Sequence, residues 1–233
     1  MNISITNVFY FPNLVDVRTA AKCGSANFKL LDAAIRTQVF DTTAKMTVRR
    51  FKNRAGPINF RDELVWQYAD ILDMPFRKES TRFAIKRDPV KRFLSAVDFL
   101  EKQMAKFNTQ EDLGARVKEQ QRTPRAYPLK GFASLEEAVS SLENGMIMDP
   151  HLNTQTFYYG NINQYDYVYD LVDMRQALEH IVSLIGNDNI PNPNFWIKSH
   201  RNKSPKILSL QLTDDLAERI KTLYRVDYDN GWC

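Results

Sequence analysis

The fold is indicated most clearly by the stretch Phe83-Ala-Ile-Lys-Arg-Asp-Pro-Val-Lys-Arg-Phe-Leu-Ser-Ala-Val97. Its apolar start predicts a strand, and Asp88 followed by Pro89 predicts the capped first turn of a helix. Apolar residues then recur at helical spacing, which gives that helix a buried face. Arg87 lies where the strand becomes the helix, and Ser95 lies two turns into the helix. The stretch therefore predicts a strand–arginine–helix unit that binds a small anion.

A second unit of this kind lies upstream, in Val15-Asp-Val-Arg-Thr-Ala-Ala-Lys-Cys-Gly-Ser-Ala-Asn-Phe28. The valines predict a short strand, and a turn at Gly24 leads into a helix. The amides of residues 25–27 are predicted to be free donors at the helix N-terminus, where the helix dipole also favours an anion. Lys22 adds a positive charge. The loop lacks the pattern G-x-x-x-x-G-K-[ST], so it is not a Walker motif.

Together the two stretches resemble the two cofactor signatures of sulfotransferases, in particular the carbohydrate sulfotransferase family that includes the chondroitin and heparan 2-O enzymes. In that family the first loop holds the 5′-phosphosulfate of 3′-phosphoadenosine 5′-phosphosulfate (PAPS), and an Arg and a Ser of the second unit hold its 3′-phosphate. The resemblance implies the second role for Arg87 and Ser95. It implies the first role for the loop residues Lys22, Cys23, Gly24, Ser25, Ala26 and Asn27.

Three further stretches resemble this family and follow in the family's order. Asp149-Pro-His-Leu-Asn-Thr-Gln155 resembles a segment that carries a candidate catalytic His, which implies that His151 is the base. Tyr165-Asp-Tyr-Val168 resembles the strand that follows, and Ile220-Lys-Thr-Leu-Tyr-Arg-Val-Asp-Tyr228 resembles the family's ending. The sequence departs from the family at Ala21, where Pro is usual, and Pro150 precedes the His.

The other histidines have less specific surroundings. His180 lies within a predicted helix, where a structural role is expected. His200 lies in the basic loop 199–204, in which Lys203 and Ser204 are candidate contacts to the nucleotide. The simpler alternatives are a solvated charged loop around His200, and for His151 a loop residue that only orients the substrate.

Strands that alternate with helices predict an α/β fold, with a parallel sheet flanked by helices and a ligand site at the carboxyl ends of the strands. The resemblance implies the P-loop-kinase-like sulfotransferase fold, in a single catalytic domain over residues 1–233. Predicted strands cover residues 14–19, 81–86 and 165–172, with a weaker one within 43–51. Predicted helices cover residues 25–40, 62–72, 89–107, 109–121, 134–143, 173–185 and 213–224.

Composition fits one globular domain, since the 233 residues are 43% hydrophobic and 26% charged. The net charge of +4 comes without a Lys/Arg block, so a basic cleft for an anionic cofactor explains it and a nucleic-acid binder is not indicated. Two cysteines offer no disulfide framework, and no cluster has metal-ligand spacing. The N-terminus does not read as a signal peptide, and no stretch is long enough to span a membrane, so a soluble cytoplasmic protein is expected.

These observations predict a PAPS-dependent sulfotransferase that moves a sulfonate to a hydroxyl acceptor, on a carbohydrate, without a metal. In-line transfer needs fixed donors around the sulfonate and a base for the hydroxyl, roles given to Lys22 and His151. One alternative is a nucleotide-dependent phosphotransferase of related fold, which needs a nucleoside triphosphate and magnesium. Another is a non-catalytic protein that binds a nucleotide or glycan. For Arg87 and Ser95 the alternative is a surface Arg and a solvent-facing Ser, and the presence of both loops favours cofactor binding over it.

Overall fold

The computed structural model describes residues 7–20, 22–25, 27–28, 31–32, 35, 76–106, 132–145, 150–194 and 211–233. The chain divides into two compact units. The first comprises Ile3–Lys86 and Asn163–Asn202, and the second comprises Arg87–Ile162 and Lys203–Cys233.

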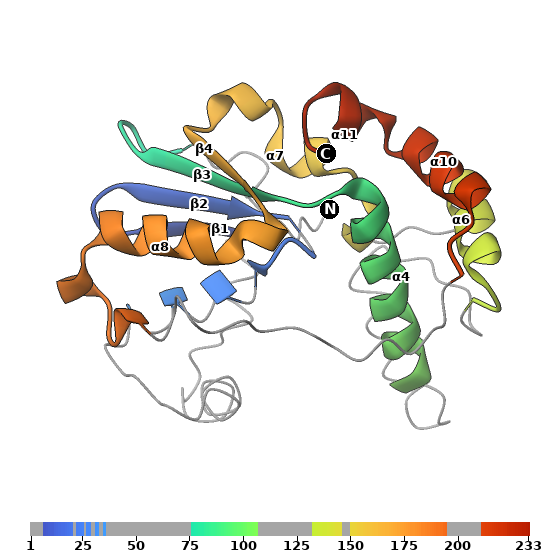
Figure 1. The fold of residues 1–233 in the computed structure, drawn as a ribbon, viewed down its shortest axis with the longest axis horizontal. Helices are drawn as coiled ribbons and strands as arrows, with labels where there is room; N and C mark the ends of the chain where they lie inside the picture. The colour runs from blue at the N-terminus through green and yellow to red at the C-terminus, as the bar shows by residue number, and fades with distance from the viewer. Residues whose placement is uncertain are drawn as a thin grey trace. The chain divides into compact units, whose positions relative to one another are not determined.

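The described part of the first unit contains a sheet and a helix that packs on it (Figure 1). Its elements are β1 (Asn7–Phe11), β2 (Val15–Thr19), β3 (Thr81–Lys86), β4 (Tyr167–Asp170) and α8 (Met174–Ile185), with 3-10 turns at Leu171–Asp173 and Asn187–Asn189. The second unit is helical where it is described. Its elements are α4 (Pro89–Lys106), α6 (Leu135–Glu143), α7 (Gln155–Tyr159), α10 (Asp214–Leu223) and α11 (Arg225–Asp229), with a 3-10 turn at Pro150–Leu152, and another turn, Ile162–Gln164, joins the units.

The sheet has the strand order β1-β2-β3-β4 among the described residues. β2 and β3 run parallel, as do β3 and β4, but β1 runs antiparallel to β2. The sheet is therefore mixed, and the expectation of a parallel sheet is right only for its β2–β4 part. The register pairs Val17 with Phe83 and Thr19 with Ile85, so β2 and β3 end at the same edge of the sheet.

The unpredicted strand β1 joins β2 through a tight turn. Val15 N–H donates to the carbonyl of Pro12 at 3.4 Å, and the two residues between them, Asn13 and Leu14, have φ of 55° and 57°. Positive φ at both central residues is typical of a hairpin turn that favours Asn-Gly. The Asn13 amide group also donates to the carbonyl of Ile185 at 2.8 Å, which caps the end of α8. This contact between distant residues stabilises a turn that the local sequence Asn-Leu does not predict.

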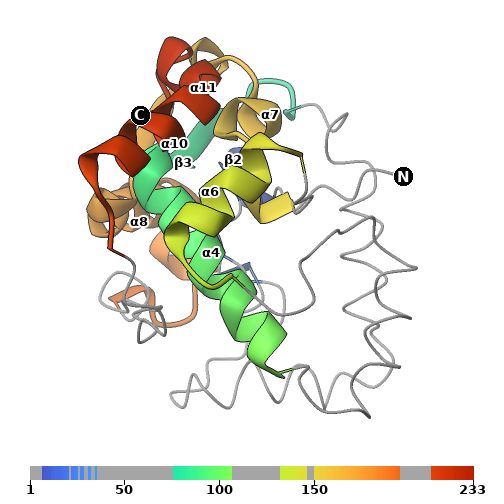
Figure 2. The ribbon, with the colours of Figure 1, turned by 90° about the vertical axis from the view of Figure 1, so that its right-hand side faces the viewer.

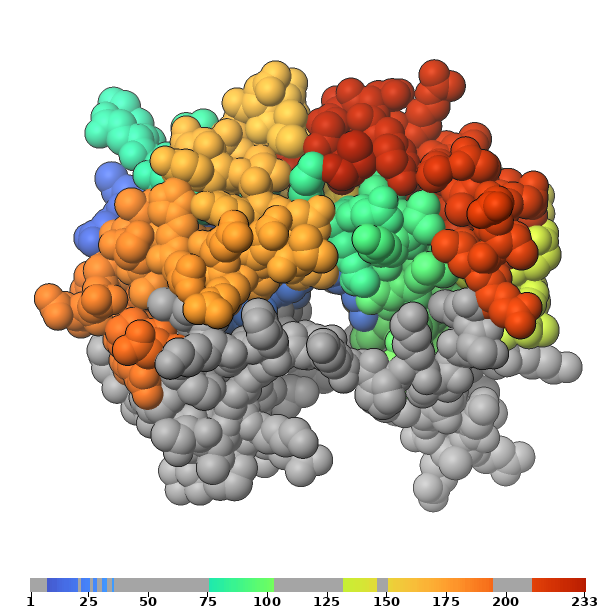
Figure 3. Space-filling model, in the orientation of Figure 1, coloured from blue at the N-terminus to red at the C-terminus, as the bar shows by residue number. Residues whose placement is uncertain are grey.

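The core of the first unit lies between one face of the sheet and α8 (Figure 1). Alternation along β2 and β3 directs apolar side chains to this face, as expected for period-2 strands. The described helical residues between 25 and 35 pack against the same core, while the opposite side of α8 is exposed, as Figure 3 shows. The buried side chains include Phe11, Val15, Val17, Phe28, Leu31, Phe83, Ile85, Ala177, Leu178, Ile181 and Ile185.

Strand β4 is shorter than the predicted range 165–172. It ends at Asp170, whose Oδ1 accepts a hydrogen bond from Val172 N–H at 3.2 Å and so caps a 3-10 turn. The alternation of apolar residues Tyr167, Tyr169 and Leu171 continues past the point where this local hydrogen bond ends the strand. Residues 171–172 therefore belong to the turn that leads into α8.

The core of the second unit lies between α4, α6 and α10, which Figure 2 shows beside one another. α4 begins at Pro89 as predicted, because Asp88 Oδ1 accepts from Lys91 N–H at 2.8 Å. α6 begins after Ser134, whose Oγ accepts from Glu137 N–H at 3.1 Å, so the helix predicted over residues 134–143 is confirmed and Ser134 is its cap. The buried side chains include Val90, Phe93, Val97, Leu100, Leu135, Val139, Leu216, Ile220 and Tyr224.

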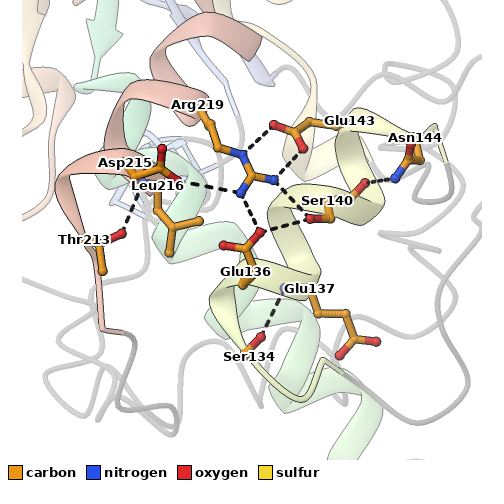
Figure 4. Close-up of polar contacts among 10 residues, drawn as sticks. All are labelled: Ser134, Glu136, Glu137, Ser140, Glu143, Asn144, Thr213, Asp215, Leu216 and Arg219. Carbon is orange, nitrogen blue, oxygen red and sulfur yellow. Dashed lines mark hydrogen bonds and ion pairs between the residues drawn. The ribbon is translucent and has the colours of Figure 1, made fainter.

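An ion-pair network joins α6 to α10 (Figure 4). Arg219 on α10 donates to Glu143 at 2.6 Å and 2.9 Å, to Glu136 at 2.5 Å and to Ser140 Oγ at 3.0 Å. The hydrogen bond from Arg219 holds the pKa of Glu143 below its ordinary value. The network therefore stabilises the contact between the two helices while Glu143 is ionised.

The remaining sequence predictions divide into two groups. The predicted helices 173–185 and 213–224 match α8 and α10 within one residue, and Gly186 with φ 87° follows the end of α8. The predicted helices 62–72 and 109–121 and the weaker strand within 43–51 lie outside the described residues.

Candidate active site

The first predicted anion loop follows β2 and turns into a helix. Cys23 N–H donates to the carbonyl of Ala20 at 3.1 Å, and the described residues from Ser25 to Ile35 are helical. Lys22 has φ 66° and Gly24 has φ 81°. Positive φ is costly for a residue other than glycine, and such residues concentrate at functional sites. The strand–turn–helix prediction is confirmed over these described residues.

The backbone donors of this loop differ from the prediction. Asn27 N–H donates to the carbonyl of Gly24 at 3.1 Å, so it is not one of the free donors expected at residues 25–27. The first turn of the helix is tight, and its hydrogen bond from residue 27 back to residue 24 uses the third of these three amides. Gly24 and Ser25 precede the first bond of the helix, so their amides have no partner within it.

Two buried polar atoms lie beside this loop in the chain. Thr19, the last residue of β2, is fully buried, and Asn27 is 9% exposed. Thr19 Oγ1 and Asn27 Oδ1 have no hydrogen-bond partner in the part of the chain that the structure describes. Buried polar groups are almost always hydrogen bonded, so these two atoms are consistent with a polar ligand or water at the turn.

Gly24 packs closely on the junction between β4 and α8. A Cβ at this position would overlap Met174 Cε and would lie 3.0 Å from Leu171 Cδ1. Met174 is only 4% exposed, so it has little space into which to move. The close packing explains why glycine occupies this point of the loop, in addition to its positive φ.

The second predicted anion-binding stretch, residues 83–97, is confirmed as a strand that runs into a capped helix. β3 ends at Lys86, Arg87 follows, and α4 begins at Pro89. Arg87 and Ser95 are both half-buried. The strand–arginine–helix arrangement predicted for this unit is therefore present in the structure.

The backbone of Arg87 is held by Gln155, for which the sequence analysis predicted no role. Gln155 Oε1 accepts from Arg87 N–H at 2.9 Å, and Gln155 Nε2 donates to the Arg87 carbonyl at 2.7 Å. Gln155 is fully buried at the start of α7. Its place at the end of the segment 149–155, which resembles the family, was the only signal, because contacts between residues 68 positions apart leave no local periodicity.

His151 lies in the 3-10 turn Pro150–Leu152, and several contacts hold it. Its ring packs on Phe99 of α4 with a centroid distance of 4.4 Å, and its carbonyl accepts from the buried Arg92 at 3.3 Å. Phe99 lies four residues after Ser95, so both are neighbours on one face of α4. The structure thus brings His151 to the face of α4 that carries Ser95.

The turn that carries His151 is also held by Tyr224, the residue that follows α10. Tyr224 donates its hydroxyl proton to the carbonyl of Leu152 at 2.5 Å. Burial raises the pKa of Tyr224 above its ordinary value, against the opposing effect of Arg92. The phenol therefore stays protonated and keeps donating at any pH near neutrality.

Three of the predicted site residues, Ala26, Lys203 and Ser204, lie outside the described residues. Within the described ranges, no group of three or more His, Cys, Asp or Glu side chains is arranged to hold a metal ion. In the same ranges, no helix combines the length and the apolar character needed to cross a membrane.

Comparison with known proteins identifies the family. A search of curated proteins and a search of solved structures found no significant match. The model of the sulfotransferase family matches residues 20–230, a range that begins just after β2 and includes the turn and helix that follow β2, the strand–arginine–helix stretch around Arg87, His151 and Gln155. Because this match covers nearly all of its 233 residues, the chain belongs to the sulfotransferase family.

Proposed function

We propose that the protein transfers a sulfonate from PAPS to a hydroxyl group of a carbohydrate. The observation that carries this proposal is the pair of positively charged positions that follow β2 and β3. The two strands are parallel neighbours that end at one edge of the sheet, and Lys22 and Arg87 follow them. A donor with phosphate groups at both ends of its ribose needs two such cationic positions. Family membership supports sulfonate transfer in general.

The first loop is assigned to the 5′-phosphosulfate. Lys22 supplies a positive charge near the bridging oxygen, and the amides of Gly24 and Ser25 supply donors at a helix N-terminus. The fully buried hydroxyl of Thr19 is available to donate as well. Cys23, Ala26 and Asn27 complete the loop. The fixed donors stabilise charge that grows on the leaving phosphate during transfer.

The strand–arginine–helix stretch around Arg87 is assigned to the 3′-phosphate. Arg87 offers a planar set of donors that suits a phosphate, and Ser95 adds a hydroxyl from α4. Lys203 and Ser204 are further proposed contacts to the nucleotide. This assignment distinguishes PAPS from a nucleoside triphosphate, which has no 3′-phosphate.

His151 is assigned as the base. As the acceptor oxygen bonds to sulfur and the bridging S–O bond breaks, the proton of the acceptor hydroxyl moves to the imidazole, and 3′-phosphoadenosine 5′-phosphate (PAP) leaves. Packing on Phe99 and the backbone contacts of the turn support this role, because a base must be held at a fixed position.

The acceptor class and the domain organisation are parts of the same proposal. The resemblance to chondroitin and heparan 2-O sulfotransferases supports a carbohydrate acceptor and a P-loop-kinase-like fold. Since the family match runs through both compact units, we propose one catalytic domain over residues 1–233.

The donor site is tested by thermal unfolding with PAP, with adenosine 5′-phosphate, and with ATP plus magnesium. A ligand that binds only the folded protein raises its melting temperature by mass action. We expect a shift with PAP that is much larger than the shift with adenosine 5′-phosphate. A shift with ATP and magnesium alone would reject the proposal in favour of a phosphotransferase.

The acceptor is tested by supplying PAPS with a desulfated glycosaminoglycan or with a simple phenol. We expect sulfated polysaccharide and an equal amount of PAP. Transfer to the phenol alone would reject the carbohydrate acceptor while leaving the donor assignment intact.

A further inference from the structure

We propose that Gln155 is a positioning residue that fixes Arg87 for recognition of the donor's 3′-phosphate, an inference that rests on the proposed function. Arg87 lies between the end of β3 and the start of α4, outside both elements. The side-chain amide of Gln155 bonds both its N–H and its carbonyl, at 2.9 Å and 2.7 Å. It thereby takes the place of a neighbouring strand at this point.

Fixing the backbone also fixes the direction of the Arg87 side chain. With both peptide groups bonded, φ and ψ of Arg87 have little freedom, and the Cα–Cβ bond follows from them. Only the side-chain torsions of Arg87 then remain free to place the guanidinium group. A phosphate-binding arginine held in this way loses less entropy on binding than one on a mobile loop.

Gln155 is itself held by the C-terminal segment. The Asp227 carboxylate accepts from Gln155 N–H at 2.8 Å and from Thr156 N–H at 2.7 Å. The second proton of Gln155 Nε2 goes to the carbonyl of Trp232 at 2.9 Å. Gln155, Asp227 and Trp232 are all fully buried, so these bonds are shielded from water.

The C-terminal segment has its own supports. Trp232 N–H donates to the Asp227 carbonyl at 2.8 Å, and the indole donates to the carbonyl of Gly160 at 2.9 Å. The Trp232 ring also packs on Tyr159 with a centroid distance of 4.6 Å. The contacts therefore run from residues 227–232 through Gln155 to Arg87, all within the second unit. This arrangement gives the end of the chain a part in donor selection.

The test is Gln155→Met, which keeps the length of the side chain and removes its hydrogen bonds. The matched control is Gln176→Met on the exposed side of α8. Isothermal titration calorimetry measures the dissociation constants of PAP and adenosine 5′-phosphate for each protein. We expect Gln155→Met to weaken PAP binding by about tenfold or more, the loss of one good hydrogen bond to phosphate, and to leave adenosine 5′-phosphate unchanged. The control is expected to match the wild type.

A double-mutant cycle shows whether Gln155 acts through Arg87. If it does, adding Gln155→Met to Arg87→Ala changes PAP binding little further. Additive losses, or equal losses for PAP and adenosine 5′-phosphate, would overturn the inference. Wild-type protein without preference for PAP would overturn the proposed function and this inference together, whereas wild-type preference that survives Gln155→Met would overturn the inference alone.

A second variant serves if Gln155→Met does not fold. Asp227→Asn keeps the shape of the side chain and removes the charge that holds Gln155. We expect a smaller but selective loss of PAP affinity and faster deuterium exchange in the peptide around Arg87. Unchanged PAP selectivity with faster exchange would assign a merely structural role to these bonds and would overturn the inference.

Discussion

Replacing Gly24 by alanine tests the geometry of the first anion loop. The residue has φ 81°, and a Cβ in that conformation costs about 1–2 kcal/mol. The new methyl group also overlaps Met174, which is 4% exposed, and overpacking of this kind costs about 1–3 kcal/mol. The sum has a middle value of about 3.5 kcal/mol, which lowers the melting temperature of a chain of this size by about 7–14 °C. Circular dichroism on heating measures the change.

The matched control is Gly145→Ala after α6. Gly145 has φ 67°, and no atom lies within 4 Å of its added Cβ. It therefore loses only the backbone contribution of about 1–2 kcal/mol. Equal destabilisation by the two substitutions would refute the close packing of the loop on Leu171 and Met174.

Four further outcomes are expected. Arg87→Ala weakens PAP binding by about tenfold to hundredfold in calorimetry and spares adenosine 5′-phosphate; equal losses for both ligands would contradict the 3′-phosphate assignment. His151→Ala lowers kcat by about a hundredfold to ten-thousandfold in a transfer assay, and a changed dissociation constant of PAP would argue against a base. Tyr224→Phe lowers the free energy of unfolding in urea by about 1–3 kcal/mol, because it leaves a buried carbonyl without its donor; no change would contradict that hydrogen bond. The pKa of Glu143 is lowered in the folded state, so its contribution to stability is full above its ordinary value of 4.5 and is lost as the pH falls through the lower folded value; Arg219→Gln should flatten this acid limb in urea titrations at several pH values, and an unchanged slope would contradict the pairing.

The parts of the fold that the sequence predicted well have local causes. Asp88 and Pro89 fix the start of α4 through one side-chain hydrogen bond and one preset dihedral angle. Gly186 ends α8 because it adopts a positive φ. Signals of this kind lie within a few residues, so they can be read without knowing the fold.

The parts that escaped prediction depend on distant contacts. Strand β1 relies on a turn at Asn13 and Leu14 that lacks the usual glycine and is supported by hydrogen bonds to the end of α8. In the candidate site, the placement of Lys22 and Arg87 in loops that suit an anion could be predicted, because both residues follow predicted strands. The role of Gln155 could not, because its partners lie at positions 87, 227 and 232.

The most direct test of the account is transfer of a labelled sulfonate from PAPS, in the absence of magnesium, to a mixture of polysaccharide, phenol and tyrosine-containing peptide. The account predicts label in the polysaccharide, an equal amount of PAP, and loss of both products with Arg87→Ala. Intact PAPS with every acceptor, together with transfer of the terminal phosphate of ATP once magnesium is added, would contradict it.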